Sequence, residues 1–205
     1  SGIGDIYRAL SKDFQYGDPY NLVTFPDNHD MQRIFSLVGE NMDLYKMALT
    51  IILTTRGIPC ILYGTEIAMP STENHGELRK DFPGGWDDDS KNAFYDFGLN
   101  KTESKAKNFM KTLLNWRKSS DAIGKGKLIH FPVTDGLYVY FRNYKEDIVM
   151  VVINNLDQRE DLDPELYKDV IGGKKKAIEI FDENAYSLRK KISIYPKTAN
   201  IFQIK

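Results

Sequence analysis

Two short apolar runs separated by one amphipathic segment constrain the first half of the chain more than any other feature. Residues 21–25 and 60–63 are apolar, and Pro or Gly ends each run. Between them, residues 43–55 place apolar side chains at the three- and four-residue spacings of one helix face, and Asp43 can cap the helix start. Strands covered on both faces of a parallel sheet read as continuous apolar runs. The sequence therefore predicts a strand–helix–strand unit of parallel type.

The second half of the chain has a different pattern. After a helix predicted at residues 103–119, short alternating strands are separated by turn residues, as in a small antiparallel sandwich. We expect strands at residues 127–131, 137–143, 148–154, 177–181, 188–194 and 199–205. The fold class is therefore α/β plus all-β, with an α/β part at residues 1–122 and a β-sandwich domain at residues 123–205.

Charge and composition exclude several classes of partner. The chain has 28 basic and 29 acidic residues, a net charge of −1, which gives no field to gather a nucleic acid or an anionic membrane. Its apolar stretches are interrupted well short of the roughly 20 residues that a membrane-spanning helix needs. Cys60 is the only cysteine, so no internal disulfide and no cysteine-built metal site is expected. We expect a neutral partner, with no nucleic acid and no membrane.

Polar side chains follow both apolar runs. Asn28, His29 and Asp30 come directly after the first run, and Glu66 comes after the second. In parallel α/β barrels, catalytic groups converge at the carboxyl ends of the strands. A carboxylate beside a histidine can hold sugar hydroxyls. Residues 27–30 can equally form a plain turn, since Asp and Asn are favoured there, and Glu66 can be a solvated loop carboxylate.

These runs resemble motifs of a known family. Phe-Pro-Asp-Asn-His-Asp at residues 25–30 resembles the strand-seven motif of the α-amylase family. Gly-Ile-Pro-Cys-Ile-Leu-Tyr-Gly-Thr-Glu at residues 57–66 is similar to the strand-eight motif, in the expected order and separation. Residues 79–86 are similar to a segment of the neopullulanase and cyclomaltodextrinase branch. The resemblance implies the C-terminal part of a (β/α)8 TIM barrel, followed by the family's C-terminal β-sandwich.

The resemblance also implies roles at the site. Asp30 corresponds to the family's third carboxylate, the transition-state stabiliser, which holds sugar hydroxyls as positive charge develops on the ring. His29 would hydrogen-bond the same sugar, and Asn28 would support both. Arg33 is placed with the substrate-binding residues, and an exposed salt-bridge partner is the alternative.

Aromatic side chains supply the remaining substrate candidates. Sugar rings present C–H faces that stack on aromatic rings, so Tyr63 and Trp86 are expected to bind substrate together with Glu66. Packing is the alternative role for any of these aromatics, because aromatic residues dominate protein cores. The expected ligand is an α-glucan oligosaccharide or polysaccharide.

The departures from the family are equally informative. A retaining glycosidase needs a nucleophilic carboxylate and an acid/base carboxylate about 5 Å apart, and neither family motif occurs in this sequence. About 120 residues precede the β-domain, whereas a complete barrel takes about 250. Residue 1 is not methionine, and no secretory signal is visible, which leaves periplasm and cytoplasm open. We therefore expect a C-terminal fragment of a glycoside hydrolase, inactive alone; a non-catalytic carbohydrate-binding or structural remnant is the alternative.

No cofactor or metal is expected. Asp87, Asp88 and Asp89 place hard oxygen ligands close together, but a solvated acidic loop is the preferred interpretation because no second ligand set is visible. Calcium in the parent enzyme is left open. Two βα units taken from a barrel leave an apolar face and a sheet edge. We expect residues 67–102 to cover part of that face, or a homodimer to hide it.

Overall fold

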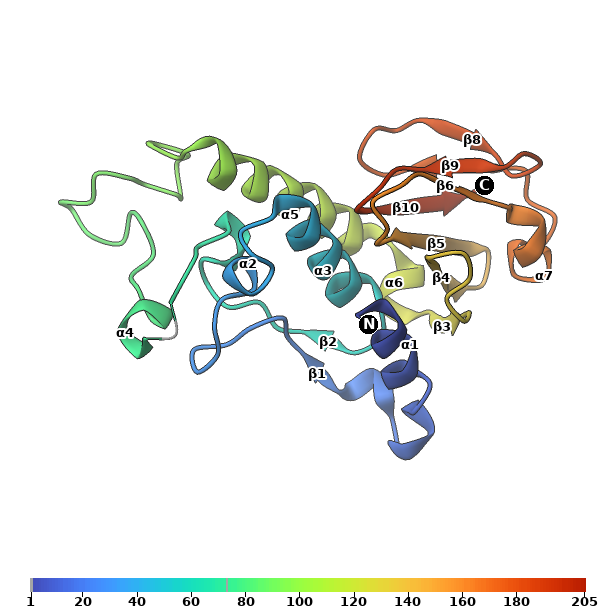
Figure 1. Ribbon diagram of the computed structural model, residues 1–205, viewed down its shortest axis with the longest axis horizontal. Coiled ribbons are helices and arrows are strands. Elements are labelled where there is room, and N and C mark those ends of the chain that lie inside the picture. Colours follow the sequence, from blue (N-terminus) through green and yellow to red (C-terminus); the bar gives the residue numbers. More distant parts are fainter. Residues whose placement is uncertain (1, 73) are drawn as a thin grey trace. The chain divides into compact units, whose positions relative to one another are not determined.

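The computed structural model describes residues 2–72 and 74–205 (Figure 1). The chain divides into two compact units, each described separately. The unit that we call the β unit consists of Ser1–Leu22, Leu53–Ile58 and Leu113–Lys205, and the one that we call the α/β unit consists of Val23–Ile52 and Pro59–Thr112. The predicted boundary between residues 122 and 123 stays a prediction, because compact units and domains of one chain need not share borders.

The two helices predicted at residues 43–55 and 103–119 are confirmed as α3 and α5. The helices are α1 (Ile3–Leu10), α2 (Ile34–Leu37), α3 (Met42–Thr54), α4 (His75–Leu78), α5 (Lys101–Ser119), α6 (Asp121–Lys125) and α7 (Lys168–Ile171), with 3-10 turns η1 (Asp13–Gln15), η2 (Pro19–Asn21), η3 (Thr65–Ile67) and η4 (Pro164–Tyr167). The cap expected at Asp43 is wrong by two residues, because Asn41 Oδ1 accepts from the amides of Asp43 and Leu44 at 2.9 and 3.1 Å. Of the other helices, α1 has eight residues, and the rest have only four or five, too few to show a helical period.

The strand–helix–strand unit is present, but its strands are short. Strand β1 (Val23–Thr24) pairs with β2 (Ile58–Pro59). The Ile58 amide donates to Leu22 O at 2.8 Å, and the Cys60 amide donates to Thr24 O at 2.7 Å. Donors and acceptors advance along both strands in the same direction, so the pair is parallel.

The second strand was predicted too late in the chain. The structure places it at β2, and residues 60–63 follow as irregular backbone. The partner strand β1 ends at Thr24, shortly before Pro26, which has no amide hydrogen to donate to a ladder. Without a partner, the apolar run after β2 does not continue as a strand.

The long excursion at residues 67–102 packs on a small core of its own. Ile67, Met69 and Ala93 are buried, and Phe82 and Leu99 pack against them. Val23, Phe25 and Ile58, along the short parallel strands, nevertheless remain 43–60% exposed. The expected cover is therefore incomplete, and the homodimer stays a prediction.

The β unit contains the predicted antiparallel sandwich. A six-stranded sheet has the order β3-β4-β5-β10-β7-β8, and β6 and β9 form a second sheet of two strands. The strands are β3 (Lys127–His130), β4 (Leu137–Tyr144), β5 (Asp147–Asn154), β6 (Glu160–Leu162), β7 (Lys176–Glu179), β8 (Ala185–Ser187), β9 (Ile192–Ile194) and β10 (Thr198–Ile204). Residues 188–191 form the turn between the two sheets, so the single strand predicted at 188–194 is wrong in its first half.

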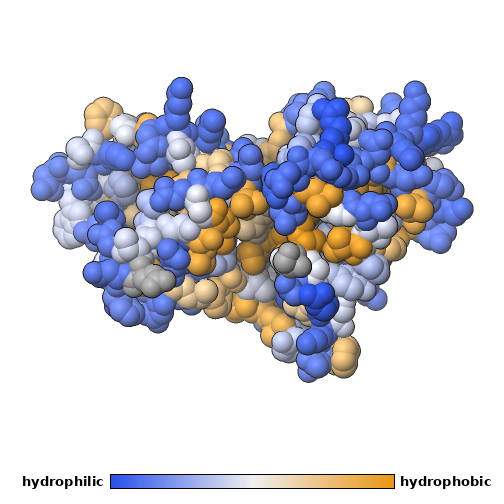
Figure 2. All heavy atoms as spheres, in the orientation of Figure 1, coloured by the Kyte–Doolittle hydropathy of each residue, from blue (hydrophilic) through white to orange (hydrophobic). Residues whose placement is uncertain are grey.

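One hydrophobic core joins the two sheets. Phe141 of β4, Met150 of β5 and Phe202 of β10 pack in the same cluster as Leu162 and Ile192 of the smaller sheet. Hydrophilic residues cover the face around β8 and β9 that Figure 2 shows. The strands therefore alternate between a shared core and solvent where the sandwich faces outward.

The other face of strand β4 is buried as well. The ring of Tyr138 contacts Tyr7 of α1, and Tyr140 Oη lies 2.5 Å from Thr54 Oγ1. Arg142 donates to the carbonyls of Ile123 and Gly126 at 2.8 Å each. Segments from before and after the strand therefore complete the β unit. Among the described residues, no helix combines the length and apolar character needed to cross a membrane.

Candidate functional site

The residues after β1 form a compact polar turn. Asn28 Oδ1 accepts a hydrogen bond from the Asp30 amide at 2.9 Å. His29 Nε2 lies 3.2 Å from Asp30 Oδ2, and Arg79 Nη2 lies 2.7 Å from Asp30 Oδ1. The Asp30 side chain is nevertheless 58% exposed. The structure thus presents an open carboxylate whose two oxygens are each oriented by a nitrogenous neighbour.

Sequence reasoning missed both Arg79 and Asp27 as parts of this arrangement. Arg79 was noticed only as the start of a family-like segment, and its partner lies 49 residues earlier. Asp27 is buried, and it accepts from the Ile34 amide at 2.8 Å and from Thr65 Oγ1 at 3.1 Å. Burial raises the pKa of Asp27, and these hydrogen bonds oppose that shift. Asp27 therefore fixes the base of the turn that carries Asp30.

Arg33 is buried rather than exposed, so the surface salt-bridge alternative is wrong. Only 1% of its surface is accessible. Its Nε donates to Leu78 O at 3.2 Å, its Nη1 donates to Tyr63 O, and its Cζ lies 4.9 Å from the centre of the Tyr63 ring. The Arg33 amide donates to Ser71 Oγ at 2.9 Å. Arg33 therefore holds the Tyr63 loop in place, and its burial leaves almost no surface for the direct substrate contact that was predicted.

A tight turn separates Tyr63 from Glu66. Gly64 has φ +84°, and a Cβ at this position would meet Met69 Sδ at 2.2 Å. The turn leaves Tyr63 42% exposed and places Glu66, half-buried, in η3. Burial raises the pKa of Tyr45, and the charges of Glu66 and Asp27 add to that shift. Glu66 and Asp27 are therefore both near enough to Tyr45 to act on its hydroxyl electrostatically.

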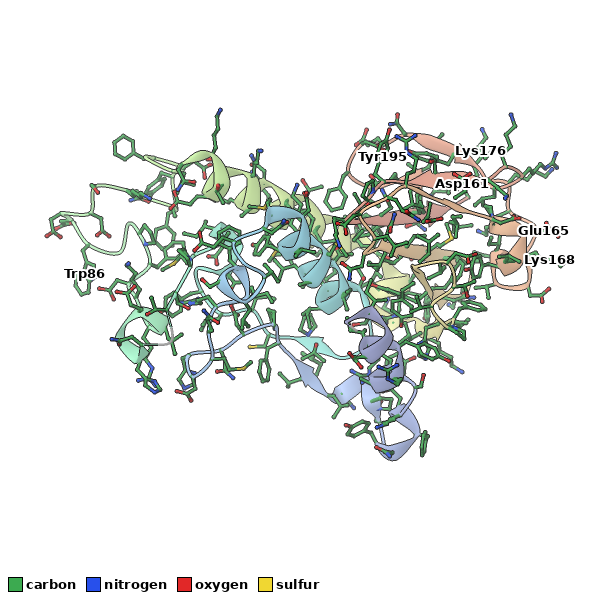
Figure 3. All side chains as sticks on the ribbon, in the orientation of Figure 1. Trp86, Asp161, Glu165, Lys168, Lys176 and Tyr195 are labelled. Atoms are coloured by element: carbon green, nitrogen blue, oxygen red, sulfur yellow. The ribbon has the colours of Figure 1, made fainter. Side chains whose placement is uncertain are left out.

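Trp86 lies at the tip of the long excursion (Figure 3). Trp86 is 66% exposed. Asp89 Oδ2 accepts from the Gly84 and Trp86 amides at 2.7 and 3.1 Å, so this member of the acidic run shapes the turn that presents the indole. Among residues 2–72 and 74–205, no group of three His, Cys, Asp or Glu side chains is arranged to hold a metal ion. Within that part of the chain, Trp86 and Asp30 share no hydrogen bond or ion pair.

Comparison with known proteins identifies both halves of the chain. Residues 3–126 match the family model described as α-amylase, catalytic domain. Residues 128–203 match the model described as cyclo-malto-dextrinase C-terminal domain. Together the two matches cover the barrel-like part and the β-sandwich strands in their expected order.

The similar proteins are much longer than this chain. Cyclomaltodextrin glucanotransferase of Paenibacillus macerans is 34% identical over 134 residues, which make up 65% of this chain and 16% of that protein. The enzyme of the same name from Thermoanaerobacterium thermosulfurigenes is 28% identical over 211 residues, with 99% of this chain and 26% of that protein covered. The chain thus spans about a sixth to a quarter of these relatives.

Solved structures share the fold. The structure of an Anoxybacillus α-amylase matches with a TM-score of 0.79 and 23% identity, and the match covers 98% of this chain and 42% of that one. The α-amylase of Geobacillus thermoleovorans, complexed with acarbose, matches with a TM-score of 0.76 and 22% identity over the same shares. A partial α/β catalytic domain, an antiparallel β-domain and the two family matches agree: the chain belongs to the α-amylase family of glycoside hydrolases.

Proposed function

We propose that the α/β unit forms one wall of the glucan-binding site of a retaining α-amylase-family enzyme, and that Asp30 is its transition-state stabiliser. The observation that carries the proposal is the open carboxylate of Asp30, held between His29 and Arg79 at the end of β1. Each oxygen of a carboxylate has more than one acceptor site, so two flanking contacts leave room for sugar hydroxyls. Hydrogen bonds to those hydroxyls strengthen as the ring approaches its oxocarbenium-like transition state.

The groups around Asp30 have distinct roles in this proposal. His29 donates to the same sugar ring, and Asn28 fixes the turn through its bond to the Asp30 amide. Arg79 sets the direction in which the Asp30 carboxylate faces. Because such contacts act on binding in the transition state, small errors in carboxylate position reduce the rate more than they reduce substrate affinity.

Aromatic residues hold the remainder of the glucan. Tyr63 is exposed at the strand end and backed by the Arg33 guanidinium, which fixes the plane of the ring. Trp86 is exposed on a turn that Asp89 stabilises. Both offer flat surfaces for the C–H faces of glucose units. Glu66 completes the polar lining. An α-glucan is the proposed substrate class, in line with two structures that share this fold and are complexed with acarbose and maltotriose.

The chain alone does not hydrolyse a glycosidic bond in this proposal. The nucleophile and the acid/base belong to family motifs on strands four and five, and residues 3–126 match only part of a catalytic domain that is longer in the relatives. A starch assay with the purified chain should therefore release no reducing sugar. Cleavage by the pure chain would refute this part of the proposal.

A glucan-binding measurement tests the proposed roles of Asp30 and Trp86. Maltoheptaose is titrated into the chain while the indole N–H resonance of Trp86 is followed by NMR, and a saturable shift is expected. Asp30→Ala should weaken the binding that this shift reports. Asp161→Ala, which removes an exposed carboxylate from β6 in the other unit (Figure 3), is the matched control and should leave binding unchanged. If Trp86 does not respond, the chain is a structural or binding remnant without this wall.

A further inference from the structure

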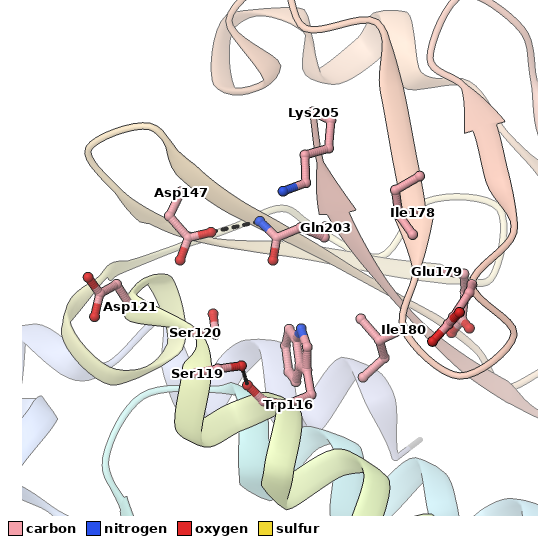
Figure 4. A pocket seen from close by; sticks show the side chains of 11 residues that line it. Trp116, Ser119, Ser120, Asp121, Asp147, Ile178, Glu179, Ile180, Gln203 and Lys205 are labelled. Atoms are coloured by element: carbon pink, nitrogen blue, oxygen red, sulfur yellow. Dashed lines mark hydrogen bonds between the residues drawn. The ribbon is translucent and has the colours of Figure 1, made fainter.

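The β unit contains a groove of about 750 Å³ that shares no residue with the site proposed above (Figure 4). Its volume lies within the range of about 300–1,000 Å³ typical of small-ligand sites. The end of α5 supplies Trp116, the start of β5 supplies Asp147, the segment after β7 supplies Ile180, and β10 supplies Gln203. All of these residues belong to one compact unit.

A fixed polar pair forms one wall of the groove. Asp147 Oδ2 accepts from the Ala122 amide at 2.7 Å, and Asp147 Oδ1 accepts from Gln203 Nε2 at 2.7 Å. Gln203 Nε2 also donates to Ile148 O at 3.1 Å. Because both of these partners are acceptors, the amide nitrogen must face them, and the carbonyl oxygen of Gln203 is directed into the groove (Figure 4). The groove therefore has a preset hydrogen-bond acceptor.

An aromatic surface lies opposite this pair. The indole of Trp116 is half-buried, stands beside Ile180, and directs its nitrogen toward the groove (Figure 4). Indole is a hydrogen-bond donor with a large apolar face. The groove thus offers a donor, an acceptor and a flat apolar face, the combination that suits a sugar ring with its hydroxyls and C–H face.

The charges of the groove favour a neutral ligand. Asp121, Asp147, Glu179 and Glu183 line it, against Lys205 as the only cation among its described lining residues. Glu179 is occupied by backbone, since its Oε2 accepts from the amides of residues 181 and 182 at 2.7 and 3.0 Å. An excess of carboxylates repels phosphate and acidic sugars. No metal-type cluster of His, Cys, Asp or Glu is found in the described chain, so a cation site has no support.

We propose that this groove is a second oligosaccharide-binding site, which takes a short neutral glucan against Trp116. The choice of a glucan as the ligand rests on the function proposed above, whereas the geometry of the groove is independent of that function. Such a site would hold a glucan chain on the β-domain independently of the residues around Asp30.

The chain provides its own reporters for the two sites. It has two tryptophans, Trp86 at the proposed substrate wall and Trp116 in the groove. Their indole N–H resonances are assigned with Trp86→Phe and Trp116→Phe, and maltoheptaose is titrated into the wild-type chain. We expect a saturable shift of the Trp116 resonance. Inorganic phosphate at the same concentrations should leave that resonance in place.

Two variants test which residues contact the glucan in the groove. Gln203→Met removes the acceptor while keeping the side-chain length, and it should raise the midpoint of the Trp116 titration about tenfold, the loss of one good hydrogen bond. Trp86→Phe should leave that midpoint unchanged, and this variant separates the two proposals. A silent Trp116 resonance in the wild-type chain overturns the groove proposal even when Trp86 responds. A shift with phosphate overturns it as well, because the charge argument then fails.

Discussion

Replacing Arg142 with methionine should destabilise the chain by about 3–5 kcal/mol, because several buried carbonyls lose their donor and each unsatisfied buried acceptor costs about 1–3 kcal/mol. Arg142 is 2% exposed. Its Nη2 donates to Ile123 O and Gly126 O at 2.8 Å each, and its Nη1 donates to Thr54 O at 3.2 Å and to Thr55 O. Methionine fills a similar volume but donates nothing.

The magnitude follows from the kind of acceptors involved. Thr54 ends α3, and the carbonyls of Ile123 and Gly126 lie at the end of α6. Helix C-termini expose carbonyls that lack intrahelical partners and carry partial negative charge, so a cation there is favourable. Burial lowers the pKa of Arg142 to about 10, which still leaves the guanidinium charged at neutral pH. The variant therefore loses a charged fork of hydrogen bonds between two helix ends.

Chemical denaturation measures this loss. Unfolding in urea is followed by circular dichroism, and the free energy of unfolding is compared between wild type, Arg142→Met and the matched control Arg189→Met. Arg189 is exposed between β8 and β9, so its replacement should change stability by less than about 0.5 kcal/mol. A loss below about 1 kcal/mol for Arg142→Met would refute the capping argument.

Three further outcomes are expected. Gly126→Ala should lower the free energy of unfolding by about 1–3 kcal/mol, because its Cβ would meet two backbone oxygens at 2.2 and 2.8 Å. Gly124→Ala, whose Cβ would meet nothing within 4 Å, should be neutral or stabilising by up to about 1 kcal/mol, as measured by thermal unfolding. Burial raises the pKa of Glu179, so between pH 4.5 and that raised pKa the folded chain binds more protons than the unfolded chain. The free energy of unfolding should therefore fall as the pH rises through this window. Glu179→Gln should flatten that dependence when denaturation is measured at several pH values. Arg79→Met should weaken maltoheptaose binding less than Asp30→Ala does, as measured by titration calorimetry, because Arg79 only orients the carboxylate.

Each of these outcomes has a result that contradicts it. Equal stability of the Gly124 and Gly126 variants would show that the backbone around α6 relaxes freely. A pH slope that persists in Glu179→Gln would assign the titration to another group. Binding that survives Asp30→Ala but is lost in Arg79→Met would make the arginine, rather than the carboxylate, the sugar contact.

Much of the fold could be predicted from the sequence because the relevant signals are local. Periods of two and of three to four residues gave β4, β5 and β10 and the long helices α3 and α5 nearly to their ends. Strand β6 has only three residues, too few to show an alternating pattern, and residues 188–191 turn between the sheets although Leu188 and Ile192 at either end are apolar. An alternating hydrophobic pattern indicates which side chains are buried, but it does not indicate which strand pairs with which.

The sequence named candidate site residues but not the contacts between them. The motif after β1 located Asn28, His29 and Asp30, and the structure brings these three together. The pairing of Asp30 with Arg79 joins residues far apart in sequence, and nothing in the local pattern indicates it. Which exposed groups touch a glucan depends on the ligand, so those roles stay proposals.

Two buried arginines show why such contacts escape sequence reasoning. Arg33 and Arg142, in different units, are both nearly inaccessible, and each directs its guanidinium at backbone carbonyls. A carbonyl acceptor is present at every residue, so no complementary side chain marks the partner in the sequence. A planar guanidinium can serve several carbonyls at once, which a lysine ammonium on a flexible stem does less well. Lysine at either position should therefore lose most of the stabilisation while keeping the positive charge. A stability loss in such a variant would show that the arginine stabilises by bridging backbone segments rather than by its charge alone.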